Sequence, residues 1–167
     1  VYTSTVIGIN AMTVEVEVNV SPGLGMYMVG LPDNAVRESQ ERIRSAFENS
    51  GQRMVGKKIV VNLAPADLKK EGSSLDLPIA IAILAATEQL DAESTRGYVM
   101  AGELSLDGTV KPIKGALPMA VEAMEKGFKQ ATKSWGDDLP DICKSTLEGA
   151  TEKIRSWAKQ DESSDEM

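Results

Sequence analysis

Residues 13–20 alternate strictly between polar and apolar side chains, in the order TVEVEVNV. A side-chain period of two is typical of a β-strand with one face packed on a core and the other in contact with solvent. Asn10 precedes this run, so we expect residues 4–20 to form a hairpin in which the stretch before Asn10 pairs with the alternating strand. Any fold for this chain must therefore contain a sheet that is covered on one face.

A second constraint comes from the apolar run LPIAIAILAA. A helix that is apolar on all sides packs against more than one neighbour, so we predict such a helix over residues 76–90. Asp33 or Asn34 is the expected N-cap of another helix over residues 35–49. Further strands are expected over residues 26–31, 58–63, 98–102 and 109–113, with a hairpin turn at Asp107–Gly108 and a helix over residues 117–126. This order predicts an α+β two-layer sandwich, a mixed β-sheet with its helices on one face.

Charge divides the chain into two parts. Residues 1–131 carry 16 acidic and 13 basic side chains, whereas residues 132–167 carry nine acidic and five basic ones. We therefore predict a domain over residues 1–131 and an acidic tail over 132–167, with an amphipathic helix over residues 143–159 that places Ile154 and Trp157 on one side. The polar residues 161–167 are predicted to be disordered.

Composition excludes several kinds of site. The chain has no histidine and one cysteine, Cys143, which excludes a Ser-His-Asp triad, a disulfide within the chain and a zinc site built from cysteines. A net charge of −7 argues against a stand-alone nucleic-acid-binding protein. No apolar run approaches the roughly 18–20 residues that span a bilayer, so we expect a cytoplasmic chain with no membrane partner. The first residue is Val1 rather than methionine, as expected for a fragment or a processed product.

Residues 51–58 (GQRMVGKK) come close to the pattern of a phosphate-binding P-loop. That pattern requires serine or threonine after the lysine, because the hydroxyl binds Mg²⁺, whereas Lys58 stands there. A P-loop also follows a strand and opens a helix, while this stretch follows one expected helix and opens a strand. We interpret it as the end of a helix and a turn, and keep a stand-alone nucleotide-binding protein as an alternative.

Two groups of polar residues are candidates for function. In the stretch Lys69–Asp76 (KKEGSSLD), either Ser73 or Ser74 is the expected N-cap of the helix that follows; the alternative is a serine nucleophile activated by a lysine. Lys69 and Lys70 are expected to lie exposed and charged. A basic cluster interspersed with glutamates indicates a solvated, salt-bridged helix face first and a phosphate or DNA contact second; it consists of Arg37, Arg42, Arg44 and Arg53.

Several longer motifs resemble a known family. They are VGLPDNAVRES (29–39), ERIRS (41–45), VNLAPADL (61–68), KEGSSLDLPIA (70–80), GELSLDG (102–108) and VKPI (110–113). In this order they resemble the N-terminal domain of the ComM/YifB group of Mg-chelatase-related AAA+ ATPases, over about residues 1–129. The resemblance implies a Lon-protease-like α+β fold, as also found in RadA-type recombination proteins.

The resemblance also carries expectations about function. In the full-length family this domain precedes an AAA+ module that binds ATP and Mg²⁺, and members of the ComM type are hexameric helicases in DNA branch migration during natural transformation. No cofactor is expected in the present chain, whose partners would be its own AAA+ module, neighbouring subunits of a homo-hexamer and DNA. The candidate DNA or subunit contacts are Arg37, Arg42, Arg44, Lys69 and Lys70.

Comparison with Lon bears on catalysis. Ser74 matches the position of the Lon nucleophile, but Leu117 stands where Lon has its lysine, and the nearby Lys114 lies three residues earlier. The resemblance therefore implies a non-catalytic domain, with a Ser/Lys peptidase related to Lon as the alternative. We predict that Leu117 is substantially buried and that no lysine nitrogen lies within hydrogen-bond reach of the Ser74 hydroxyl.

Overall fold

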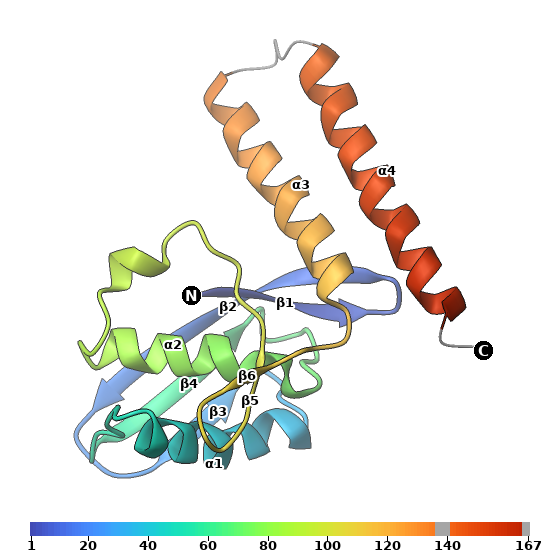
Figure 1. The fold of residues 1–167 in the computed structure, drawn as a ribbon. Coiled ribbons are helices and arrows are strands. Elements are labelled where there is room, and N and C mark those ends of the chain that lie inside the picture. The colour runs from blue at the N-terminus through green and yellow to red at the C-terminus, as the bar shows by residue number, and fades with distance from the viewer. Residues whose placement is uncertain (136–140, 165–167) are drawn as a thin grey trace. The chain divides into compact units, whose positions relative to one another are not determined.

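The computed structural model describes residues 1–135 and 141–164 and divides the chain into two compact units. The first unit comprises Val1–Thr5 and Thr13–Lys114, and the second comprises Val6–Met12 and the chain from Gly115 onward. Figure 1 shows the elements of both units.

The first unit is built on a four-stranded sheet with the order β1-β2-β4-β3. Its strands are β1 (Tyr2–Ile7), β2 (Asn10–Ser21), β3 (Met26–Val29) and β4 (Lys58–Ala64). Strand β2 runs antiparallel to β4 and β3 runs parallel to it, so the sheet is mixed. The hairpin expected over residues 4–20 and the inner position expected for residues 58–63 are confirmed.

Helices α1 (Asn34–Asn49) and α2 (Asp76–Ala86) cover one face of this sheet (Figure 1). Asp33 is the N-cap of α1, where its side chain accepts a hydrogen bond from the backbone N–H of Val36, as the sequence predicts. A 3₁₀ turn, η1 (Ser73–Leu75), leads into α2, and a second one, η2 (Ala92–Thr95), follows it. Helix α2 ends four residues before the predicted end, because the chain turns at Thr87 and Glu88 adopts a positive φ of 59°.

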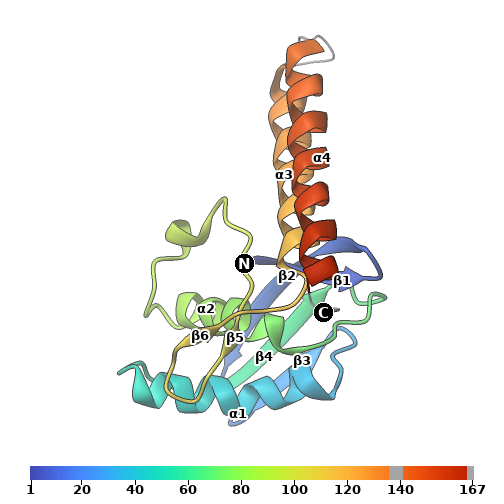
Figure 2. The same ribbon diagram turned by 45° about the vertical axis from the view of Figure 1, so that its right-hand side comes forward.

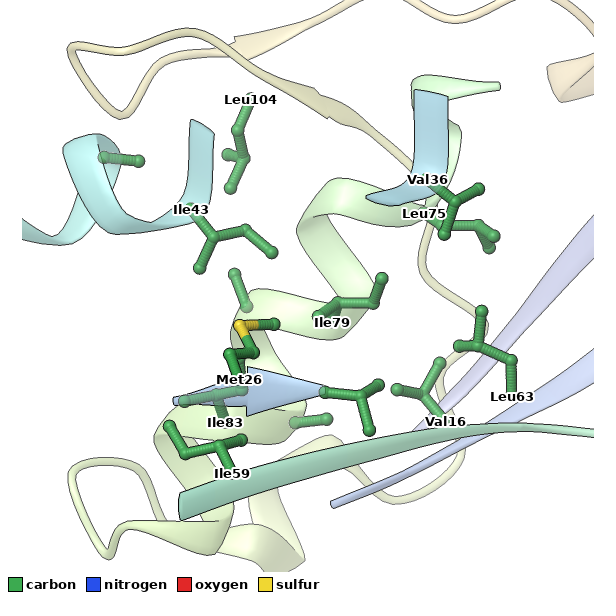
Figure 3. Packing of buried hydrophobic residues seen from close by; sticks show 14 of the residues in the cluster. Val16, Met26, Val36, Ile43, Ile59, Leu63, Leu75, Ile79, Ile83 and Leu104 are labelled. Carbon is green, nitrogen blue, oxygen red and sulfur yellow. The ribbon is translucent and has the colours of Figure 1, made fainter. Parts of the chain in front are cut away.

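The core lies between the sheet and these two helices, as Figure 3 shows. Alternate residues of β4 and of β2 from Val14 to Val18 point into it, which is the structural outcome of the alternating sequence. No residue from 76 to 85 of α2 is exposed, which confirms a helix packed on more than one side. The buried side chains include Val14, Val16, Met26, Val36, Ile43, Phe47, Ile59, Val61, Leu63, Leu75, Ile79, Ile83 and Leu104.

The strand predicted over residues 98–102 is wrong in position. Val99 makes only an isolated bridge to Tyr2, and the strands that form are the short β5 (Glu103–Leu104) and β6 (Val110–Lys111), in a separate two-stranded sheet. The physical reason lies at Gly102, whose N–H donates to the Ser74 carbonyl and whose carbonyl accepts from Leu77. These backbone groups connect the loop to the start of α2 instead of continuing a sheet. The hairpin turn at Asp107–Gly108 is confirmed between β5 and β6.

The second unit contains helices α3 (Ala116–Trp135) and α4 (Asp141–Ser164), which pack side by side (Figure 2). Helix α3 is longer than the residues 117–126 predicted for it, and the helix expected over residues 143–159 lies inside α4. Residues 161–164, predicted to be disordered, are the last turn of α4, and residues 165–167 lie outside the described part. The side chain of Trp157, placed by the sequence on one side of this helix, is also outside the description.

Candidate functional site

Two loops of the first unit are bonded together at the N-terminus of α1. The Asp33 N–H donates to the Lys70 carbonyl at 3.0 Å, and the Lys70 N–H donates to the Leu31 carbonyl at 3.2 Å. The second carboxylate oxygen of Asp33 accepts from the Gly72 N–H at 3.2 Å. One carboxylate thus caps a helix and holds the neighbouring loop, so the motifs at 29–39 and 70–80 form a single structural corner.

Lys70 does not lie where the sequence predicts. Its side chain is completely buried, and its Nζ donates a hydrogen bond to the Pro65 carbonyl. Burial lowers the pKa of the Lys70 ammonium, because desolvation disfavours the charged form. The expectation of an exposed Lys70 is wrong, since the side chain is buried and the Pro65 carbonyl accepts a hydrogen bond from its Nζ.

Lys69 lies exposed, as predicted, and pairs with Glu71 at the surface. The hydrogen bond to Glu71 raises the pKa of Lys69. Side chains of successive residues in this stretch therefore point to opposite environments, one to solvent and one to the interior.

Arg42 and Asp76 form a two-point ion pair between α1 and α2. Arg42 Nε lies 2.6 Å from Asp76 Oδ2 and its Nη2 lies 2.9 Å from Oδ1, while Nη2 also donates to the Ala35 carbonyl at 2.9 Å. Asp76 is fully buried and accepts a further hydrogen bond from the Leu104 N–H at 3.2 Å. Burial raises the pKa of Asp76 although the Arg42 hydrogen bonds act in the opposite direction, and the bond to Asp76 raises the pKa of Arg42.

The serines next to this pair do not cap α2. Gly72 occupies the N-cap position of the 3₁₀ turn, and no side chain caps either that turn or α2. The Ser73 hydroxyl instead donates to the Glu103 carboxylate, and the Ser74 carbonyl accepts from the Gly102 N–H. The capping prediction is wrong, because the turn over residues 73–75 continues directly into the helix and Ser73 faces β5.

Ser74 and Leu117, the positions that match the Lon dyad, are both half-buried. Leu117 belongs to the first turn of α3 in the second unit, whereas Ser74 belongs to the first unit. Leu117 is largely but not fully buried, which agrees with its predicted burial, and Met119 and Val121 further along the helix are buried more deeply. The polar side chains next to Ser74 in the sequence bond to other groups: Lys70 donates to the Pro65 carbonyl, Ser73 donates to the Glu103 carboxylate, and Asp76 pairs with Arg42.

The predicted basic cluster is split by the fold. Arg37 and Arg44 are exposed on α1, and Arg37 lies near the Pro32 carbonyl at the bonded corner. Pro32 in turn bridges to Lys70, the neighbour of Lys69, so Arg37 and Lys69 flank the same corner. Arg44 lies two turns further along α1, and the Arg42 guanidinium is held by Asp76 inside the domain.

The P-loop-like stretch forms the end of α1 and a turn. Ser50 is the C-cap of α1, its N–H donates to Ala46 and Phe47, and Gly51 follows with a positive φ of 72°. Strand β4 then begins at Lys58, so this stretch leads into a strand and does not open a helix as a P-loop does. This geometry supports the helix-end interpretation and does not fit a bound nucleotide.

Sequence reasoning missed Asp76 and Glu103 as members of the site. The sequence contains a sign of the role of Asp76. It is the first residue of a helix that is apolar on all sides, so its carboxylate is buried, and a buried carboxylate requires a cationic partner. Among residues 1–135 and 141–164, no group of three acidic, cysteine or histidine side chains has the geometry of a metal site. In the same described residues, no helix has the length and apolar character of a membrane span.

Comparison with known proteins identifies the family. Residues 16–133 match the family described as subunit ChlI of Mg-chelatase. The chain belongs to the ChlI family. Within it, YifB of Escherichia coli K12 is 51% identical over 130 residues, which are 77% of this chain and 26% of that protein. The competence protein ComM of Haemophilus influenzae is 44% identical over 131 residues, which are 78% of this chain and 26% of that protein.

These ChlI-family relatives are longer than the present chain, which spans about a quarter of their length. A more distant similarity links the chain to Lon protease 2 of Bacillus subtilis, with 29% identity over 92 residues, or 55% of this chain and 16% of that protein. The predicted relationship to the ComM/YifB group is confirmed. The α+β class with a mixed sheet is confirmed as well, and the specific Lon-like fold stays a prediction.

Proposed function

We propose that this chain is the non-catalytic N-terminal domain of a longer, ComM-like AAA+ ATPase, with a Lon-like fold that engages DNA and contributes to a hexamer active in branch migration. Similarity to YifB and to the competence protein ComM supports the proposal. ATP and Mg²⁺ would bind the AAA+ module of the longer protein, because the loop over residues 51–58 does not fit a nucleotide.

The proposal that the domain is non-catalytic rests on the hydrogen bonds and ion pairs of the lysines near Ser74. A serine nucleophile needs a base within hydrogen-bond reach. Lys70, the lysine whose lowered pKa would suit that role, directs its Nζ to the Pro65 carbonyl, and Lys69 pairs with Glu71 at the surface. The polar side chains thus stabilise the corner, and the two alternatives, a Ser/Lys peptidase and a stand-alone nucleotide-binding protein, are not favoured.

Arg37 and Lys69 are the residues that we propose for DNA contact. They are exposed and flank the bonded corner, so a phosphate backbone can approach both from solvent. Residues 1–131 carry a net charge of −3, and a single copy is therefore expected to bind weakly, with a ring of six copies supplying avidity.

The test is the salt dependence of DNA binding by the longer protein that contains this chain. The slope of log K against log salt is negative, and each lost phosphate contact reduces its magnitude by about 0.7 for single strands and about 0.9 for duplexes. We expect the double variant Arg37→Ala and Lys69→Ala to lose one or two phosphate contacts per contacting subunit. The magnitude of the slope then falls by that many contacts, and binding weakens for all DNA sequences alike.

A matched control removes the same charge elsewhere in the domain. Arg53→Ala combined with Arg96→Ala is expected to leave the slope unchanged, since both residues are exposed, Arg53 follows the C-terminal end of α1, opposite to the end that Asp33 caps, and Arg96 follows η2. Equal affinities and slopes for both double variants and the parent protein would contradict DNA contact at this corner.

A further inference from the structure

A hollow of about 390 Å³ lies between the C-terminal half of α1 and the two loops that lead into β3 and β4. Its floor is apolar: Met26 and Ile59 are buried there, and Met54 and Val55 are half-buried. Figure 3 shows Met26 and Ile59 close together at this end of the core. The apolar floor of the hollow is therefore continuous with the core of the first unit.

The rim of the hollow is formed by exposed charged side chains. Arg44, Glu48 and Lys57 line it, and all three side chains are exposed. Within the described part of the chain, neither cation takes part in an ion pair. The segment 53–58 also adds Arg53 and Lys58 and contains no acidic residue, so this region is locally basic in a chain whose net charge is −7.

Leu24 extends the apolar surface at the edge of the hollow. Its side chain is 77% exposed, although it stands beside buried Met26 in the loop before β3. An exposed leucine next to an apolar floor, with cations at the rim, is the arrangement of a site that binds an apolar side chain from an acidic segment.

We propose that this hollow, bounded by Arg44 and Lys57, is a docking site for a short acidic peptide of a partner protein that inserts an apolar side chain. The volume lies at the lower end of the range of ligand sites, which suits one or two side chains. Charge complementarity selects the flanking residues of the peptide, because carboxylates can pair with Arg44 and Lys57. No aromatic residue lines the hollow itself, but the exposed Tyr27 ring lies next to Gly25 with Lys58 Nζ 5.4 Å from its centroid, so single-stranded DNA is included as a competitor in the test.

The proposal is tested with labelled peptides and fluorescence anisotropy. The probe is a six-residue peptide with two central leucines flanked by acidic residues, and its controls replace the leucines by serine or the acidic residues by lysine. We expect saturable binding of the probe, weakened about tenfold or more by either replacement, since apolar burial and charge pairing both contribute.

Charge reversal identifies the site. Arg44→Glu combined with Lys57→Glu is expected to weaken binding of the acidic probe at least about tenfold and to strengthen binding of the lysine-flanked peptide. Arg96→Glu combined with Lys111→Glu is the matched control with the same charge change and is expected to bind the acidic probe with a loss of less than about threefold. Circular dichroism and the thermal midpoint establish that each variant is folded.

Three results would overturn the proposal: no saturable binding of the acidic probe, equal binding of the serine-containing peptide, or equal losses in the two charge-reversed variants. Displacement of the probe by single-stranded DNA through the same residues would make the surface a nucleic-acid interface and would also overturn it. The DNA experiment at Arg37 and Lys69 uses other residues, so the two proposals fail separately.

Discussion

Replacing Asp76 with alanine is expected to lower the free energy of unfolding by about 3–5 kcal/mol, as measured by urea denaturation. Asp76 is fully buried, accepts two hydrogen bonds from the Arg42 guanidinium and accepts a third from the Leu104 N–H. The variant removes the acceptor of the Leu104 N–H and takes from the mostly buried Arg42 guanidinium its counter-charge and two of its hydrogen bonds, and that cost exceeds the net contribution of the intact pair.

A surface pair provides the matched control. Arg96 and Glu93 form an ion pair at 3.0 Å with both side chains largely exposed. Glu93→Ala is therefore expected to change the free energy of unfolding by less than about 0.5–1 kcal/mol. Similar effects at Asp76 and Glu93 would show that the buried pair does not stabilise the corner.

The partner substitution Arg42→Met has a pH-dependent outcome. Burial raises the pKa of Asp76, and removing Arg42 removes the hydrogen bonds that oppose this shift, so the pKa rises further. Between the unfolded and the folded pKa the folded state binds more protons, and stability falls as pH rises through this window. The free energy of unfolding of Arg42→Met is thus expected to recover in part when the pH is lowered from about 7 to about 5, relative to the parent chain. A difference between the two proteins that is independent of pH would contradict this assignment.

The second large effect is expected from Gly30→Ala, at about 3–5 kcal/mol of lost unfolding free energy. Gly30 has a φ of 95°, and a Cβ atom there would lie 2.9 Å from the Leu63 carbonyl carbon and closer still to its oxygen. Both the backbone conformation and the close approach of the two chain segments exclude a side chain. Relief of the clash would require β4 to move away from the loop that carries Asp33.

Gly51→Ala separates the cost of the backbone conformation from the cost of the steric clash. Gly51 also has a positive φ, 72°, but an added Cβ would meet no atom within 4 Å. Its substitution is expected to cost only about 1 kcal/mol, the penalty of the left-handed conformation alone. If Gly30→Ala and Gly51→Ala lower the thermal midpoint equally, the contact with Leu63 is not what requires glycine at position 30.

Local patterns in the sequence predict the sheet and α1 well. The alternation in residues 13–20 and the apolar residues of 58–63 place β2 and β4 correctly, and Asp33 caps α1 as its position before the helix suggests. Each of these features depends on residues close in sequence, where side-chain period and capping chemistry decide the structure.

Interactions between distant residues account for the errors. Lys70 is buried because the carbonyl of Pro65 and the loop around Leu31 surround it, and Ser73 turns to Glu103, thirty residues away. Residues 98–102 have the composition of a strand, yet their backbone groups bond to Tyr2, Ser74 and Leu77. No pattern within a short window contains this information.

The central claim is that the polar groups around Ser74 stabilise the domain and do not catalyse hydrolysis. Cleavage of fluorescently labelled, unfolded casein by the chain and by Ser74→Ala tests it most directly. We expect both proteins to give the rate of casein alone, because Lys70 donates to Pro65 and Lys69 pairs with Glu71, so the two lysines nearest to Ser74 in sequence bond to other groups. Cleavage by the parent chain that Ser74→Ala abolishes would contradict the claim and would identify the domain as a Ser/Lys peptidase.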